Sequence, residues 1–178
     1  MPDLPSAALP VRRLRAVTAA ERQVLAALLI DCVEGGASVS FMAPLALPKA
    51  LAFWDRVAAD VDTGARALLV AEDASGIVGT VQIMLDQPEN QPHRADVSKM
   101  LVHRRARRQG WGAALMGAAE AVARECGKSL LVLDTASGDA ERLYARLGWQ
   151  PCGVIPGYAL WPQGGLCDTR YFYRPLGA

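Results

Sequence analysis

The stretch Arg-Arg-Gln-Gly-Trp-Gly at residues 107–112 is the most informative part of this chain. It follows the apolar residues 100–102 and opens a helical pattern from Ala113 onward. The first amides of a helix have no partners within the helix, and the helix dipole adds partial positive charge there. Gly110 and Gly112 remove side chains that would keep a ligand from the backbone. A strand, a glycine-bearing turn and a helix start in this order predict a site for a phosphorylated ligand.

Charge and hydropathy narrow the class of ligand. Four arginines, at positions 104, 105, 107 and 108, are attractive to polyanions, and beside two glycines at a helix start we expect at least one of them to contact phosphate, the alternative being a solvated turn. The net charge is only +1 over 178 residues, so we expect no general binding of nucleic acid, and the basic run 103–108 is a remote rival. The sequence has no run of 18 apolar residues, so we expect no membrane span.

Length and composition indicate a soluble globular protein. We expect a flexible N-terminal arm at 1–10, which is rich in proline, and a single domain at 11–178. The four cysteines are scattered, without a zinc spacing, and are best read as small buried apolar residues in a reducing cytoplasm. The two histidines are not spaced as metal ligands, so we expect no metal site.

Hydrophobic periodicity predicts an alternation of strands and helices. Thr18 and Glu21 form a capping-box pattern at the start of the first helix. Strands are expected at 11–17, 67–72, 77–85, 94–102, 130–133, 154–155 and 169–173, and helices at 18–34, 44–61, 113–126 and 140–147. Polar residues 134–139 and an aromatic stretch at 157–165 are expected to be loops. The fold class is therefore α/β (α+β), with one mixed, mostly antiparallel sheet of about six or seven strands flanked by helices.

The segment Arg-x-x-Gly-x-Gly at 107–112, between a strand and a helix, resembles the first signature of the GNAT superfamily of N-acetyltransferases. Residues 143–149, Leu-Tyr-Ala-Arg-Leu-Gly-Trp, are similar to its second signature. Both lie at the usual separation in the expected order of elements. Segments 93–97, 133–135 and 156–158 also resemble a narrower group in that superfamily, which confers tabtoxin resistance by acetylating an amino-acid toxin.

The resemblance implies that acetyl-CoA is the cofactor and CoA a product. Its pyrophosphate would lie on the backbone of the motif and the helix start, namely Arg107, Arg108, Gln109, Gly110, Trp111, Gly112 and Ala113. Its pantetheine arm would pair with the backbone of the preceding strand at Leu101, Val102 and His103. The acetyl group would pass directly to an amine in a ternary complex.

Such a reaction needs a base, because an alkyl ammonium has a pKa of about 10.4 and its neutral form costs roughly 4–5 kcal/mol at pH 7. Asp96 lies within a predicted strand, and Asp134 lies at the end of an apolar one, where open sheets place ligand-facing groups. An exposed strand residue and a loop cap are the ordinary alternatives for these two acids. Asp96, Asp134 and a water chain all remain candidates for the base.

The resemblance also implies that Tyr144 protonates the departing thiolate, the alternative being a tyrosine of the core. Loops 35–41 and 157–165 would bind the acceptor, and Phe41, Tyr158 and Trp161 would line its pocket unless they merely cover the core. We expect the acceptor to be a small-molecule amine, either amino-acid-like or an antibiotic or toxin, and the protein to be a monomer or homodimer. A catalytically inactive CoA-binding or sensor module with the same fold is the alternative function.

Overall fold

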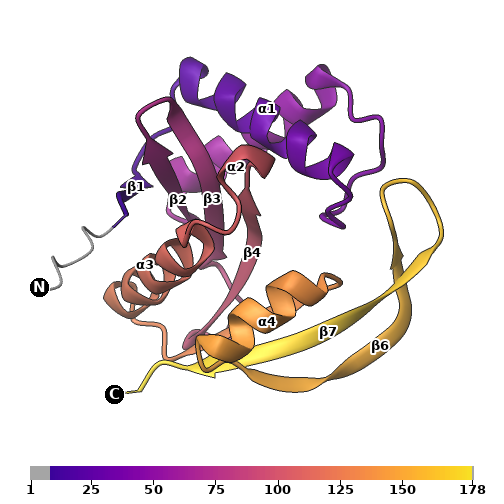
Figure 1. Ribbon diagram of the computed structural model, residues 1–178. Coiled ribbons are helices and arrows are strands. Elements are labelled where there is room, and N and C mark those ends of the chain that lie inside the picture. Colours follow the sequence, from indigo (N-terminus) through magenta and orange to yellow (C-terminus); the bar gives the residue numbers. More distant parts are fainter. Residues whose placement is uncertain (1–8, 178) are drawn as a thin grey trace, which may run out of the picture.

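The computed structural model describes residues 9–177 as one α/β domain (Figure 1). Its strands are β1 (Val11–Leu14), β2 (Arg66–Asp73), β3 (Gly76–Met84), β4 (Arg94–Val102), β5 (Leu130–Thr135), β6 (Gln150–Leu160) and β7 (Leu166–Pro175). Its helices are α1 (Ala19–Glu34), α2 (Leu47–Thr63), the short 3₁₀ helix η1 (Arg104–Ala106), α3 (Trp111–Glu125) and α4 (Gly138–Arg146). Apart from η1, this is the order that the sequence predicts. Of the arm predicted at 1–10, residues 1–8 lie outside the described part.

All seven strands form one sheet in the order β1-β2-β3-β4-β5-β7-β6. Every neighbouring pair is antiparallel except β4 and β5, which run parallel. The predicted fold class, a mixed and mostly antiparallel sheet flanked by helices, is confirmed. The parallel pair needs a crossover, and α3 supplies it.

The helices cover the two faces of the sheet as separate layers (Figure 1). Helices α1 and α2 pack on one face through a core that includes Leu25, Trp54 and Leu68. Helices α3 and α4 pack on the other face, in the core that holds Leu69 of the same strand β2. Leu68 and Leu69 belong to different cores because successive side chains of a strand point to opposite faces.

Local signals set several element ends. The capping box predicted at Thr18 and Glu21 forms, since the Glu21 amide donates to Thr18 Oγ1 at 3.2 Å and the Thr18 amide donates to Glu21 Oε2 at 2.9 Å. Helix α3 begins at Trp111, two residues before the predicted start at Ala113. The first strand ends at Leu14 rather than at residue 17, and α2 begins at Leu47 rather than at residue 44.

The largest correction concerns the C-terminal hairpin. The aromatic loop predicted at 157–165 is wrong for residues 157–160, because β6 continues to Leu160, and it is confirmed for residues 161–165, which form the turn to β7. The pairing of β6 with β7 is irregular between Ile155 and Ala159, and this bulge removes the alternating pattern that marks a strand in sequence. Strand β5 likewise continues through Asp134, which was predicted to begin a loop.

The cysteines are all free thiols. Cys32 and Cys167 are buried, as predicted, and burial raises the pKa of the Cys32 thiol to about 11. Cys126 is half-buried, and Cys152 is exposed on β6, so the prediction of a buried residue is wrong there. Over residues 9–177, no group of three or more His, Cys, Asp or Glu side chains is placed to hold a metal ion, and no helix has the length and apolarity needed to cross a membrane.

Candidate active site

The site is built around the place where the two parallel strands part. Strands β4 and β5 pair only from Arg94 with Leu130 to Asp96 with Val132. Beyond these residues β4 continues to Val102 without a ladder partner on that side, so backbone groups of β4 are free to pair with a ligand. This is the strand whose backbone at Leu101 and Val102 was predicted to hold the pantetheine arm.

The motif at 107–112 forms a backbone cradle at the start of α3. Gly110 is the N-cap and has a left-handed conformation with φ of 89°, and Arg108 is also left-handed with φ of 61°. No side chain caps the first turn, so its amides remain available to an anion. The sequence prediction of an anion site at this helix start is consistent with this geometry.

Gly112 has a packing role besides leaving the backbone open. A Cβ added at this position would lie 3.0 Å from Cδ2 of Leu143 on α4 and 3.8 Å from Sδ of Met100 on β4. The second glycine of the motif therefore lets α3 approach α4 and β4 closely. From the sequence alone, only access for a ligand was expected at this position.

Two of the four arginines form ion pairs with other parts of the chain. Arg104 pairs with Asp31 of α1 at 2.8 Å, and its amide also donates to that carboxylate at 2.9 Å. Arg105 pairs with Asp73 at the β2–β3 turn at 2.6 Å. These ion pairs fasten the loop before the cradle to both neighbouring elements. Arg107 and Arg108, which were predicted as cofactor ligands, are exposed.

Some of the backbone groups predicted for the pantetheine arm already have partners. The amide of His103 donates to the Val78 carbonyl oxygen at 2.8 Å, and the Val102 carbonyl oxygen accepts from Arg107 Nε at 3.2 Å. The side chain of His103 accepts from the Arg105 amide at 3.2 Å and so caps η1. A ligand that used the Val102 carbonyl would have to displace Arg107.

Tyr144 lies on α4 within the core of the α3 and α4 face, with 5% of its surface exposed. Its ring centroid is 6.0 Å from that of Trp149 and 5.8 Å from that of Phe172. Burial first, and then the negative charge of Asp134, raise the pKa of the Tyr144 phenol above its usual value. The phenol therefore stays protonated throughout the neutral range, close enough to Asp134 to feel its charge.

The two candidate acids lie on the opposite face, the one covered by α1 and α2. Asp96 is paired with Val132 across the sheet, and Asp134 is two residues further along β5, so both side chains leave the same face. Their surroundings differ. Asp96 forms an ion pair with Arg94 and accepts from Gln87 Nε2 at 3.1 Å. The exposed Asp134 accepts from Thr169 Oγ1 at 2.7 Å and forms no ion pair with any described residue.

The residues predicted to bind the acceptor lie on two sides of this region, Phe41 in the loop before α2 and Tyr158 on β6. Phe41 packs edge-on against Phe53 of α2 with centroids 5.4 Å apart. Tyr158 of β6 meets Tyr171 of β7, with hydroxyl oxygens 3.1 Å apart, and Tyr171 pairs with Asp134 in the sheet. The loop before α2 and the turn between β6 and β7 are in contact, because the Ala43 amide donates to the Pro162 carbonyl oxygen at 2.9 Å.

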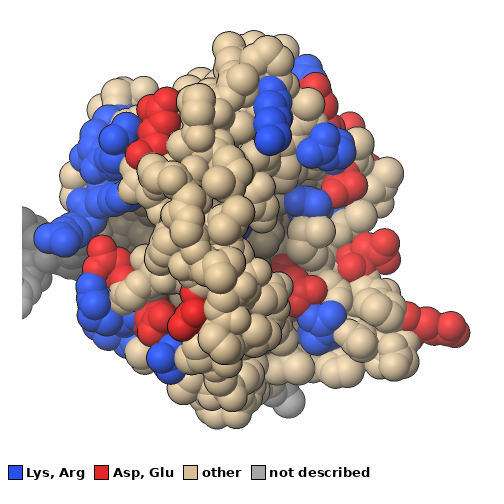
Figure 2. Space-filling model, turned by 90° about the vertical axis from the view of Figure 1, so that its right-hand side faces the viewer, with Lys and Arg blue, Asp and Glu red and all other residues tan. Residues whose placement is uncertain are grey.

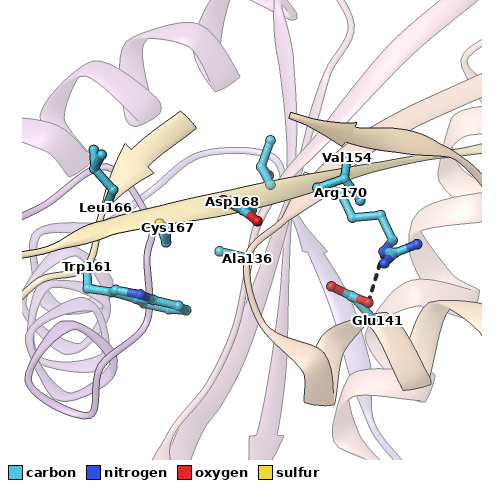
Figure 3. Close-up of a pocket in the computed structure, with 9 residues that line it drawn as sticks. Ala136, Glu141, Val154, Trp161, Leu166, Cys167, Asp168 and Arg170 are labelled. Atoms are coloured by element: carbon cyan, nitrogen blue, oxygen red, sulfur yellow. Dashed lines mark ion pairs between the residues drawn. The ribbon is translucent and has the colours of Figure 1, made fainter. Parts of the chain in front are cut away.

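Trp161 lines a cavity of about 370 Å³ between the β6/β7 hairpin and the start of α4 (Figure 3). Figure 3 shows Trp161 at one end of it and the ion pair of Arg170 with Glu141, 3.0 Å long, at the other. Thr169, the hydrogen-bond partner of Asp134, also lines this cavity. Seen from the hairpin side, the uncharged surface forms a central ridge with acidic and basic side chains on both flanks (Figure 2).

Sequence reasoning missed several residues of this region. Phe53 packs on Phe41 and lies under the Lys99 ammonium, Thr169 donates to Asp134, and Tyr171 contacts Tyr158. Lys99 lies in a β-bulge of β4, and the sequence gives no sign of this bulge. Tyr171 and Thr169 alternate with Phe172 and Arg170 along β7, and that period of two could have placed them on one face with Asp134.

Residues 64–151 match the acetyltransferase (GNAT) domain family. Solved structures share the fold over nearly the whole chain. An N-acetyltransferase from Staphylococcus aureus Mu50 is 15% identical with a TM-score of 0.77, over 94% of this chain and 99% of that one. A ribosomal-protein-alanine N-acetyltransferase from Brucella melitensis is 23% identical with a TM-score of 0.77, over 94% and 99%. A phosphinothricin acetyltransferase from Sinorhizobium meliloti, solved with acetyl-CoA, is 20% identical with a TM-score of 0.77, over 96% and 89%.

The domain match and the shared fold define the class of protein by its architecture: a single domain with the GNAT fold. Over residues 64–151 the chain matches the GNAT acetyltransferase domain, and it shares its fold with structures of N-acetyltransferases, one of them solved with acetyl-CoA. The residues present are chemically suited to acetyl-CoA, since the start of α3 has no side-chain cap, Gly110 is left-handed and β4 continues beyond its ladder with β5. The narrower likeness to the tabtoxin-resistance group stays a prediction.

Proposed function

We propose that this protein transfers an acetyl group from acetyl-CoA to the amine of a small molecule, by direct attack within a ternary complex. One observation carries the proposal: a carboxylate lies beside the gap between β4 and β5, and a phenol near it lies on the opposite face of the sheet. Asp134 stands on the α1 and α2 face, and Tyr144 stands on the α3 and α4 face. The charge of Asp134 contributes to the raised pKa of Tyr144, which supports their being close together.

The cofactor would lie on the α3 side of this gap. We propose that the backbone from Arg107 to Ala113 holds its pyrophosphate and that the free edge of β4 at Leu101 and Val102 holds its arm. Acetyl-CoA supplies a thioester from which an amine can take the acetyl group. The exposed Arg107 and Arg108 add attraction for the phosphates, but the uncapped amides supply the fixed, directed contacts.

We propose Asp134 as the group that binds the acceptor ammonium and takes its proton. Its exposed carboxylate has one hydrogen bond, from Thr169, and keeps acceptor capacity for a second donor. Asp96 is a weaker candidate, because Arg94 and Gln87 already occupy both of its oxygens. It contributes negative charge to the same face, as its effect on the pKa of Tyr171 indicates.

We propose that Tyr144 donates a hydrogen bond to the departing thiolate. A thiol has a pKa of about 8.5, so complete proton transfer from a phenol with a raised pKa would be uphill. Donation of a hydrogen bond needs no such transfer and still stabilises the charge that develops on sulfur. The released thiolate is then protonated, either by solvent or by the proton that the amine loses.

For the acceptor we propose an amine of amino-acid or toxin type. The region that would receive it combines the aromatic residues Phe41 and Tyr158 with the acid Asp134, which suits a small cation with an apolar part. The competing function, a CoA-binding module without catalysis, would keep the cradle but would have no need for a carboxylate and a phenol on opposite faces of the gap.

The first test is a thermal shift with acetyl-CoA. At 100 times its Kd a ligand adds about 2.7 kcal/mol, which for a domain of this size corresponds to a rise in Tm of roughly 5–10 °C. Gly110→Glu should abolish the rise, since it puts a carboxylate where the pyrophosphate belongs. Gly127→Glu is the matched control at the other end of α3: its φ of 73° imposes similar backbone strain, and it should keep the rise.

The second test is product formation with a panel of primary amines, followed through the free thiol. Acetylated product from any amine supports the proposal. A thermal shift with acetyl-CoA but no product from the whole panel would favour the inactive binding module. No shift with acetyl-CoA or CoA would reject both.

A further inference from the structure

Lys99 holds an unusual place on β4, at the edge of the proposed acceptor region. Across the β3–β4 ladder Thr80 pairs with Leu101 and Gln82 pairs with Ser98, so two residues of β4 stand opposite one of β3. Lys99 is in this bulge and has a left-handed backbone with φ of 49°. Bulges redirect side chains, and strained non-glycine residues gather at functional sites.

The ammonium of Lys99 points toward α2 and the loop before it. Its Nζ donates to Ser40 Oγ at 3.3 Å and lies 5.9 Å from the ring centroid of Phe53. Ser40 is itself left-handed, with φ of 76°. Two strained residues from distant parts of the chain therefore meet at this contact, on the face of the sheet from which Asp134 projects.

This ammonium has no carboxylate within ion-pair distance among residues 9–177, although it is half-buried. Arg66, the cation whose charge also acts on it, is neutralised by Asp60 at 2.7 Å. Burial lowers the pKa of Lys99, and the charge of Asp134 opposes that effect. A hydroxyl and an aromatic ring compensate poorly for the loss of water around a full charge, so an anion arriving here would be stabilised.

The region thus offers a free cation and a free carboxylate on the same face. Lys99 is on the α2 side beside Phe53, and Asp134 is on the hairpin side beside Tyr171. A zwitterion matches this pair of charges, with its anion toward Lys99 and its ammonium toward Asp134. A polycationic acceptor such as an aminoglycoside would place like charge against Lys99.

We infer that the acceptor is an α-amino acid, an amine with a carboxylate on the neighbouring carbon, and that Lys99 binds this carboxylate. The inference rests on the proposed function and narrows its substrate class. Lys99 acts on substrate binding rather than on the chemical step, because the reacting amine is held by Asp134. Loss of the Lys99 charge should therefore raise KM and leave kcat almost unchanged.

The experiment measures steady-state kinetics with the standard α-amino acids and, for each one accepted, with the amine that lacks the carboxylate, such as isoamylamine for leucine or phenethylamine for phenylalanine. Lys99→Met should raise KM for the amino acid roughly 10–100-fold, as expected for one charge-assisted hydrogen bond, and should change that for the matched amine less than about twofold. Lys99→Arg should restore most of the affinity.

Lys128→Met is the matched control, because Lys128 is also half-buried but its Nζ donates to the Leu85 and Pro92 carbonyl oxygens, both at 2.8 Å, away from the acceptor region. It should leave KM for both substrates unchanged. If Lys99→Met fails to fold, the wild-type enzyme alone decides, since it should prefer each amino acid to its matched amine by a similar factor.

Equal effects of Lys99→Met on both members of a pair would overturn the inference. So would a wild-type enzyme that acetylates amines but no amino acid, and in that case the proposed function would stand. Absence of product from every amine and every amino acid would instead remove the proposed function itself, and the inference with it.

Discussion

Removal of the Tyr144 hydroxyl is the most direct probe of the chemistry, because the structure separates its effects on stability and on turnover. In Tyr144→Phe the ring keeps its contacts with Trp149 and Phe172, at centroid distances of 6.0 and 5.8 Å. The raised pKa of the phenol comes from burial and from Asp134, with no hydrogen bond from a described residue. The substitution therefore breaks no internal hydrogen bond, and we expect the free energy of unfolding to change by less than about 0.5 kcal/mol.

Turnover should respond differently. A hydrogen bond to a charged group contributes roughly 1.5–3 kcal/mol, so its loss at the departing thiolate should lower kcat by about 10–150-fold. The KM for acetyl-CoA should stay within about twofold, because the cradle at α3 is intact. The phenol keeps its proton well above neutral pH, so the ratio of wild-type to mutant kcat should be constant between about pH 6 and pH 9.

The assay is release of free thiol at saturating acceptor, together with a urea titration of each variant. Tyr173→Phe is the control, since it also removes one phenolic hydroxyl, which donates to Gln150 Oε1 at 2.5 Å away from the gap. It should leave kcat unchanged. An unchanged kcat in Tyr144→Phe would refute the role of the hydroxyl. A loss of several kcal/mol of stability would show that the hydroxyl has a structural partner.

Two further predictions concern acids near the site. Asp134→Asn should lower kcat/KM for the acceptor by about 100-fold or more in the amine-acetylation assay. Asp96→Asn should lower it less than about tenfold, because the Asp96 carboxylate already pairs with Arg94. The reverse order of effects would exchange the roles of the two acids. Burial raises the pKa of the Asp31 carboxyl, but the hydrogen bonds from Arg104 outweigh that effect and lower the pKa below its usual value. Its stabilising effect is therefore full at neutral pH and is lost as the pH falls through the acid range, so urea titrations should show a steeper loss of stability on acidification for the wild type than for Asp31→Asn, and parallel curves would contradict the pairing.

Much of the fold could be read from local patterns. The capping box at Thr18, the apolar stripe of α3 and the glycine motif at 107–112 each depend on residues close together in the chain, and all three are where the sequence predicts them. The full length of β6 was not predicted, because that strand does not depend on a local pattern alone. Its bulge at 156–158 breaks the alternation, and the strand exists because β7 pairs with it.

The candidate site was predictable in part. Tyr144, Asp134 and the cradle follow from the resemblance and from the position of an acid at a strand end. Lys99 could not be found, because it enters the acceptor region only through a bulge that depends on pairing with β3. The different surroundings of Asp96 and Asp134 were equally hidden, since Gln87 and Thr169 come from other parts of the chain.

The sequence by itself determined the fold class of this protein: the element order, the glycine motif and the tyrosine signature are local, and local backbone preferences and side-chain spacing suffice to encode them. Only the tertiary structure decided which charges are free. Arg104 and Arg105 are neutralised by partners distant in sequence and Asp96 by the nearby Arg94, while Lys99 and Asp134 form no ion pair among the described residues. Electrostatic interactions depend on distance and burial in the folded chain, and neither can be read from the order of its residues.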